Sequence, residues 1–304
     1  MRYSAYRQEI TLPAQYTNCN NINPDFINTF PTPALFNNGN LNTTFPGAAG
    51  TGTIDQNCYA DGEASLAIKN ELAQGPVIVS LVGYTVAYNT LDNNRSPTSG
   101  LLVTVAQDLA GVGGDVNFLK SSIDTKLYSE VLPDIIGMAR VQAGYATGWG
   151  GQNLRMLDHF QAGPNLVRGF QPAGFGPRDL TPGTNLDALG GSVYWAATYE
   201  LQTPLFFAPK DFGMRFAMFA DAGQLWDYRG PTSFAATGET ICQGVVSGVD
   251  LAAGCNSNAL RASVGVGLLW DSPLGPLRFD VAYPVAKSSF DRTQIFRFGG
   301  GTKF

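Results

Sequence analysis

The sequence has few charged residues. Asp, Glu, Lys and Arg make up 14% of its 304 positions, whereas soluble globular domains contain about 25%. Hydrophobic residues are an ordinary 44%, and Gly (36 residues) and Phe (19 residues) are numerous. Few charges combined with much glycine and many aromatic side chains indicate a β protein with one wall that faces something other than water.

Basic clusters and long apolar runs are also missing. The formal net charge is −5 and the pI is near 4.9, so nucleic acid is not expected as a partner. No apolar run reaches 18 residues, and no transmembrane helix is predicted. The first ten residues lack the apolar segment of a secretory signal peptide. The chain is therefore expected either to stay in the cytoplasm or to be a fragment of a longer protein.

Cysteine is scarce, with four residues in two segments rich in Asn, Gly and Pro. Pairing within each segment predicts two disulfides that close loops, Cys19–Cys58 and Cys242–Cys255, and these would indicate export. Four free thiols are the alternative. No metal site is expected, because neither pair has CxxC spacing and the single histidine, His159, is distant.

Alternation of apolar and polar residues dominates from residue 76 onward. In 259–272, for example, Val264 and Val266 alternate with Arg261 and Ser263. Ten strands are predicted, at residues 2–13, 76–91, 99–110, 116–131, 134–149, 191–204, 212–226, 259–272, 276–286 and 294–304. Several are long enough to cross a bilayer, for which about ten residues of a tilted strand suffice.

The lengths of the connections provide a second signal. Long connections at 14–75, 150–190 and 227–258 follow the first, fifth and seventh strands, whereas the even-numbered connections are short. Odd-numbered connections of an up-and-down meander all emerge at one end of the strands. Long loops at one end and tight turns at the other predict an all-β fold, a transmembrane antiparallel up-and-down β-barrel.

A soluble β-sandwich is the alternative fold, but it would not sort its loops in this way. Trp149, Trp226 and Trp270 lie near predicted strand ends, as in an aromatic girdle, and ordinary packing is the alternative for each. Residues 61–74 are interpreted either as a short helix within the first long loop or as the approach to the second strand.

Five motifs carry a resemblance to a known family. They are YNTLDNNRSPTSG (88–100), VRGF (167–170), FADAG (219–223), SPLGPLRFDVAYPV (272–285) and FGGGTKF (298–304). In this order the motifs resemble the BamA family of the bacterial surface antigen group, which folds and inserts β-barrel proteins in the outer membrane of Gram-negative bacteria.

The resemblance covers residues 1–304 as one C-terminal part of the barrel domain. It implies about the last ten of sixteen strands, with the first strands, the POTRA domains and the signal peptide upstream. An open sheet leaves two unpaired edges, which hydrocarbon does not tolerate. The chain is therefore expected to be a fragment or to be completed by another chain, and a small closed barrel of ten strands is the alternative.

The family resemblance implies that the VRGF loop folds into the barrel lumen, where its arginine meets acidic residues. Alternation within 191–204 and 212–226 directs Glu200 and Asp221 inward, and a guanidinium offers planar donors to both carboxylates. We predict a cluster of Arg168, Glu200 and Asp221 that fixes the loop to the wall. The alternative is a solvated Arg168 in a wet lumen. The remaining motif residues are Val167, Gly169 and Phe170, of which the glycine would permit a sharp turn and the phenylalanine would add a packed anchor.

The last strand is the second candidate site. The resemblance implies a lateral gate toward the bilayer at the seam that this strand forms. The residues concerned are Gly299, Gly300, Gly301 and Phe304. Three consecutive glycines weaken a strand, as a gate requires. The alternative is that these glycines only permit close strand packing or curvature.

No nucleophile–base pair, metal cluster or phosphate loop is recognisable, so the chain is not expected to be an enzyme or to need a cofactor. The resemblance implies a component of the assembly machinery in the bacterial outer membrane. Its implied partners are the lipid bilayer, nascent outer-membrane proteins and accessory lipoproteins. The alternatives are a related translocation factor, of the TamA or two-partner secretion type, and a passive porin.

Overall fold

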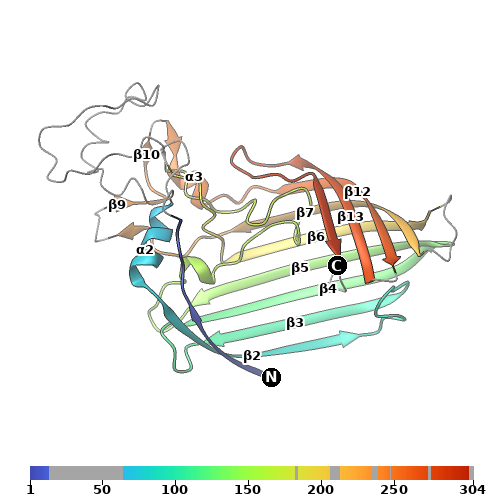
Figure 1. Ribbon diagram of the computed structural model, residues 1–304, viewed down its shortest axis with the longest axis horizontal. Helices are drawn as coiled ribbons and strands as arrows, with labels where there is room; N and C mark the ends of the chain where they lie inside the picture. The colour runs from blue at the N-terminus through green and yellow to red at the C-terminus, as the bar shows by residue number, and fades with distance from the viewer. Residues whose placement is uncertain are drawn as a thin grey trace, which may run out of the picture.

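The computed structural model describes residues 1–13, 64–181, 184–205, 213–234, 239–246, 248–272 and 275–300. Its main element is an antiparallel sheet of ten strands, paired in chain order (Figure 1). The strands are β1 (Arg2–Gln8), β2 (Val77–Asn89), β3 (Gly100–Ala110), β4 (Phe118–Leu132), β5 (Ile135–Gly148), β6 (Val193–Pro204), β7 (Met214–Trp226), β12 (Arg261–Ser272), β13 (Gly275–Ala286) and β14 (Phe296–Gly300). All ten predicted strands are present; the first ends earlier than predicted, and the last is described over Phe296–Gly300.

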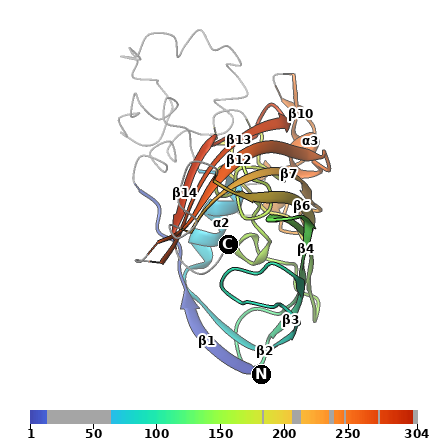
Figure 2. The ribbon, with the colours of Figure 1, turned by 90° about the vertical axis from the view of Figure 1, so that its right-hand side faces the viewer.

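The sheet curls without closing. Among the described residues, β1 and β14 are its two edges and each pairs with one neighbour. Figure 2 shows the curl, with β14 and β1 both on the left of the view. The predicted up-and-down strand order is therefore confirmed, and the two open edges are those expected of the ten strands alone. An edge strand in hydrocarbon requires a partner for its backbone groups.

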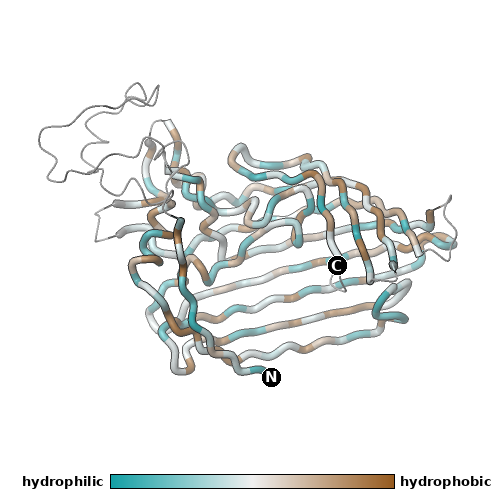
Figure 3. Tube along the Cα trace, viewed as in Figure 1, coloured by the Kyte–Doolittle hydropathy of each residue, from teal (hydrophilic) through white to brown (hydrophobic). Residues whose placement is uncertain are grey.

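Hydrophobic and hydrophilic residues are interspersed along the strands (Figure 3), and the two faces of the sheet differ in exposure as the alternation predicts. In β12, Val264 and Val266 are 47% and 41% exposed on the convex face, whereas Arg261 and Ser263 are fully buried on the concave face. We call the concave side the inner face. Apolar side chains directed outward from a curled sheet are typical of a barrel wall in a bilayer.

The long connections gather at one end of the sheet, as the parity of the loops predicts (Figure 1). The connection after β1 contains α2 (Leu66–Gln74), so of the two interpretations of residues 61–74 the short helix is the one present. The connection after β5 contains the 3₁₀ helix η3 (Met156–Asp158). The connection after β7 contains β8 (Ser233–Phe234), β9 (Glu239–Thr240), β10 (Val245–Val246), β11 (Val249–Asp250) and α3 (Leu251–Cys255).

These three connections share a small core, which we call the cap. Its buried apolar residues are Ala67, Met156, Leu189, Ile241 and Cys255. An ion pair between Arg155 and Glu71, with side chains 13% and 2% exposed, ties the loop after β5 to α2. The Nδ1 of His159 donates to the carbonyl oxygen of Arg155 at 2.8 Å, and its Nε2 accepts the backbone N–H of Arg229 at 3.0 Å. The imidazole is therefore neutral, and burial lowers its pKa to about 4.

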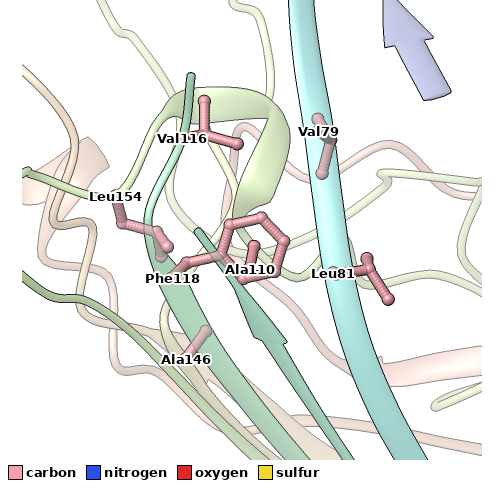
Figure 4. Close-up of a cluster of buried hydrophobic side chains, with 7 residues drawn as sticks. All are labelled: Val79, Leu81, Ala110, Val116, Phe118, Ala146 and Leu154. Carbon is pink, nitrogen blue, oxygen red and sulfur yellow. The ribbon is translucent and has the colours of Figure 1, made fainter. Parts of the chain in front are cut away.

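A second apolar cluster fills the inner face at the cap end of β2–β5 (Figure 4). Its members are Val79, Leu81, Ala110, Val116, Phe118, Ala146 and Leu154. Leu154 belongs to the loop after β5 and is 1% exposed. Burying a leucine side chain contributes about 1.5–3 kcal/mol, so this contact helps to seat the loop inside the curl of the sheet.

A disulfide joins Cys242 to Cys255 and closes the segment that contains β10, β11 and α3. This pairing is the one predicted from the sequence. The other predicted pair, Cys19–Cys58, lies outside the described residues. Within the described ranges, no helix has both the length and the apolar character needed to cross a membrane.

Candidate functional site

The candidate site begins with the loop between β5 and β6, whose tip lies against the inner face. The N–H groups of Leu166 and Val167 both donate to the carbonyl oxygen of Gly163 at 3.0 Å, which forms a tight turn before the VRGF motif. Gly169 has φ +89° and its backbone lies against β13, where an added Cβ would be 3.3 Å from the carbonyl oxygen of Ala282. A side chain is unfavourable here both for its φ and for the space it needs. The sharp turn predicted at this glycine is present.

Arg168 is the centre of the site. Its Nη1 donates to Glu200 Oε2 at 2.7 Å. Its Nε and Nη2 donate to the two oxygens of Asp221, each at 2.7 Å, and its backbone N–H also reaches Asp221 Oδ2 at 3.0 Å. The guanidinium carbon lies 3.4 Å from the centroid of the Phe219 ring. The arginine therefore combines a bidentate ion pair, a second ion pair and a cation–π contact.

The register of β6 and β7 explains why the two carboxylates meet. Thr198 of β6 lies opposite Asp221 of β7, and Glu200 lies two residues further along the same face of β6. Both carboxylates are buried, with 0% exposure for Glu200 and 3% for Asp221. Two buried carboxylates this close require a cation. The structure thus brings together the three residues that the sequence predicted to meet.

The sequence interpretation missed two members of the cluster, Arg278 and Asp280 of β13. The Nη1 and Nη2 of Arg278 donate to the two oxygens of Glu200 at 3.1 and 2.7 Å, and its Nε donates to Asp280 Oδ2 at 2.8 Å. Asp280 Oδ1 also lies 3.9 Å from Nη1 of Arg168. The signal was available, because alternation in 276–286 places both residues on the polar face.

The cluster therefore contains two arginines and three carboxylates in a buried setting. Removing one partner of a buried ion pair typically costs about 3–5 kcal/mol, because the other charge is left uncompensated. Glu200 has two arginine partners, whereas Asp221 makes its ion pair with Arg168 alone among the described residues. Asp221 is the member that depends most on the loop.

The other two residues of the motif anchor the loop by packing. Val167 and Phe170 are fully buried. They pack with Ala162, Phe175 and Leu225 in one apolar cluster. The rings of Phe170 and Phe175 are edge to face, with centroids 5.0 Å apart. The loop tip is thus held by packing on one side and by buried charges on the other.

The candidate gate strand β14 pairs with β13 over its described residues, Phe296–Gly300. Gly299 lies opposite Arg278 and Gly300 lies opposite Leu277. Phe296 and Phe298 are directed outward and are 55% and 56% exposed. The two other predicted gate residues, Gly301 and Phe304, lie outside the described residues.

A cavity of about 440 Å³ adjoins the ion-pair cluster on the inner face. Its lining includes Arg168, Glu200 and Arg278 of the cluster, together with Arg140 and Arg215 of the wall. Arg140 forms its own bidentate ion pair with Asp124 at 2.9 and 2.7 Å, and this pair does not include a loop residue. The chemistry of this region is electrostatic, and its geometry suits it to holding a loop in place.

Comparison with known proteins is consistent with this geometry. The profile of the Omp85 superfamily domain matches residues 13–304. The outer membrane protein assembly factor BamA of Neorickettsia risticii is 33% identical over 248 residues, which is 81% of this chain and 30% of that protein. BamA of Neisseria meningitidis is 29% identical over 71% of this chain and 28% of that protein. The Sorting and assembly machinery component 50 homolog of Bos taurus is 33% identical over 53% of this chain and 34% of that protein. The chain thus spans about a third of the length of these relatives.

A solved structure shows the same fold. The crystal structure of BamA from Haemophilus ducreyi lacking POTRA domains 1–3 superimposes with a TM-score of 0.61 and 23% sequence identity, covering 73% of this chain and 42% of that one. The family resemblance inferred from the five motifs is confirmed by these matches. The chain therefore belongs to the Omp85 superfamily.

Proposed function

We propose that the chain is part of an outer-membrane protein assembly factor, which folds β-barrel proteins and inserts them into the membrane. Its outer-membrane location follows from its superfamily and its BamA relatives. The proposed partners are the lipid bilayer, nascent outer-membrane proteins and accessory lipoproteins. The proposed action is not enzymatic, because it lowers the barrier to insertion without making or breaking covalent bonds.

The observation that carries this proposal is the buried connection between the loop and the wall. Arg168 joins the loop tip to β6 and β7 by three charged hydrogen bonds of 2.7 Å. A passive pore has no need for a loop that is fixed to its inner wall by buried charges. An assembly factor needs an inner wall of defined shape beside a seam that opens. The proposed roles are therefore a loop lock at the VRGF motif and a lateral gate at β14.

The test is an insertion assay with the intact protein in liposomes. An unfolded outer-membrane barrel protein is added, and its folding is followed by protease resistance and by altered migration on gels. The wild-type protein is expected to accelerate insertion over empty liposomes, and Arg168→Gln is expected to slow it at least tenfold. Arg140→Gln is the matched control, because it breaks an ion pair of the same wall that does not involve the loop.

Four results would contradict the proposal. Insertion no faster than in empty liposomes would exclude an assembly function. Equal losses for the two variants would exclude a specific role of the lock. Steady conductance in planar bilayers without assembly activity would identify a passive porin, and export of a soluble substrate would favour a translocation factor.

A further inference from the structure

The segment that leads into the last strand lies directly on the locked loop. This segment, residues 287–295, joins β13 to β14, and we call it the connector. The N–H of Gln171 donates to the carbonyl oxygen of Arg292 at 3.0 Å, and the N–H of Gln294 donates to that of Gly169 at 2.9 Å. The connector and the VRGF loop therefore share a short antiparallel ladder. The residue after the arginine of the lock, Gly169, is bonded to Gln294, two residues before β14 begins.

A second buried ion pair fixes the connector to the wall. Arg261, the first residue of β12, donates from Nε and Nη2 to the two oxygens of Asp291 at 3.0 and 3.1 Å. Both side chains have 0% exposure. The Oδ2 of Asp291 also accepts the N–H of Ser288 at 2.7 Å, and Arg261 Nη2 donates to the Ser288 hydroxyl at 3.0 Å. A single carboxylate thus shapes the turn of the connector and binds it to β12.

Within the described residues, the beginning of β14 is consequently held differently from its glycine segment, Gly299 and Gly300. At its beginning, the N–H of Ala282 donates to the carbonyl oxygen of Ile295 at 2.8 Å, and Arg297 donates to Asn165 of the loop at 2.9 Å. Further along the strand, Gly299 and Gly300 pair with β13 and carry no side chains to pack. Among the described residues, β14 has no second strand as a neighbour.

We propose that Arg261 and Asp291 are positioning residues that pin the beginning of the last strand to the locked loop. With its beginning fixed, β14 separates from the sheet from its glycine end. The pair also links the loop to the gate, because the connector is bonded to both. The use of this movement in assembly rests on the proposed function, whereas the pinning is a property of the chain itself.

The first test measures hydrogen exchange at single amides of the intact protein in lipid nanodiscs. Antiparallel pairing directs the amides of Arg297 and Gly299 toward β13. In the wild-type protein, Gly299 is expected to exchange at least tenfold faster than Arg297. Equal exchange at these two amides would overturn the proposal, because it would mean that neither end is preferentially fixed.

The second test breaks the pair with Asp291→Asn. Exchange at the amides of Arg292, Gln294 and Arg297 is expected to rise at least tenfold. The milder variant Arg261→Lys, which keeps the positive charge, is expected to give a smaller rise and serves if the first variant does not fold. Glu71→Gln is the matched control, because it breaks a buried ion pair of the cap that does not contact the connector. Unchanged exchange in Asp291→Asn, or the same rise in Glu71→Gln, would overturn the proposal.

The liposome assay separates this inference from the proposed function. Asp291→Asn is expected to slow insertion at least threefold when the wild-type protein is active. If the wild-type protein does not assemble barrels, the proposed function fails while the exchange pattern still decides the pinning. If exchange rises in Asp291→Asn but the insertion rate is unchanged, the link between connector and gate is refuted.

Discussion

The dependence of Asp221 on a single arginine leads to a quantitative prediction. Replacing Arg168 by Gln removes three charged hydrogen bonds and leaves Asp221 buried with no other ion-pair partner among the described residues. Breaking a buried pair in this way costs about 3–5 kcal/mol. The destabilisation at Glu200 is smaller, because Glu200 keeps both hydrogen bonds from Arg278. Most of the cost of Arg168→Gln is therefore expected to reside in the stranded charge of Asp221.

A double-mutant cycle isolates this charge. Asp221→Asn alone leaves Arg168 with Glu200 and is expected to cost less than Arg168→Gln. In the double variant the stranded carboxylate is gone. The destabilisation of the double variant should therefore be smaller than the sum of the two single destabilisations by about 2 kcal/mol, within the usual range for residues in one network. The assay is the opening free energy of the loop, measured by exchange of the backbone amide of Arg168 itself, which donates to Asp221.

The control cycle uses Arg140 and Asp124, which form a bidentate pair on the same inner face with side chains 21% and 34% exposed. Because water reaches this pair, its coupling should stay below about 1 kcal/mol. Additive costs in the Arg168 and Asp221 cycle would refute the reasoning. They would mean that water or another cation compensates Asp221 when the arginine is removed.

Three further predictions concern the loop and the cap. Gly169→Ala should destabilise the docked loop by about 1–2 kcal/mol, because a non-glycine residue is strained at φ +89°, and exchange of the loop amides measures this. Acidification should loosen the cap, because burial lowers the pKa of His159 to about 4. The contribution of the neutral His159 side chain to the stability of the cap is complete above the unfolded pKa of about 6.5. This contribution falls by about 2 kcal/mol at pH 5 and is lost below pH 4. His159→Gln should flatten this pH dependence of cap stability in a proteolysis assay. Reducing Cys242–Cys255, which closes a loop with a separation of 13 residues, should cost about 3 kcal/mol and speed proteolysis between the two cysteines.

Alternation predicted the direction of side chains well, because a strand has a fixed period of two. Glu200 and Asp221 were placed on the inner face by their own segments, and both are buried there. The contact with Arg168 could not be derived in this way, because a loop has no period that fixes its path. It was expected only from the family resemblance, and the structure supplies the distances.

The ion pair between Arg278 and Glu200 is a second contact that strand alternation does not predict. The inward direction of Arg278 follows from alternation, but its partner Glu200 lies in β6, with β7 and β12 between the two strands. A flat sheet would hold strands this far apart at about three times the spacing of 4.7–4.9 Å. Only the curl of the sheet brings the two side chains together, and the period of a strand does not encode that curl.

Small residues on β12 provide the space for this arrangement. An added Cβ at Gly265 would lie 2.5 Å from the ring of Phe219, and one at Gly267 would lie 2.5 Å from Asp280 Oδ1. The aromatic ring that stacks on Arg168 and the carboxylate that holds Arg278 therefore both lie over bare backbone of the strand between them. The small residues that alternate with the valines of β12 are thus part of the lock, because they let its charged and aromatic parts meet across the inner face.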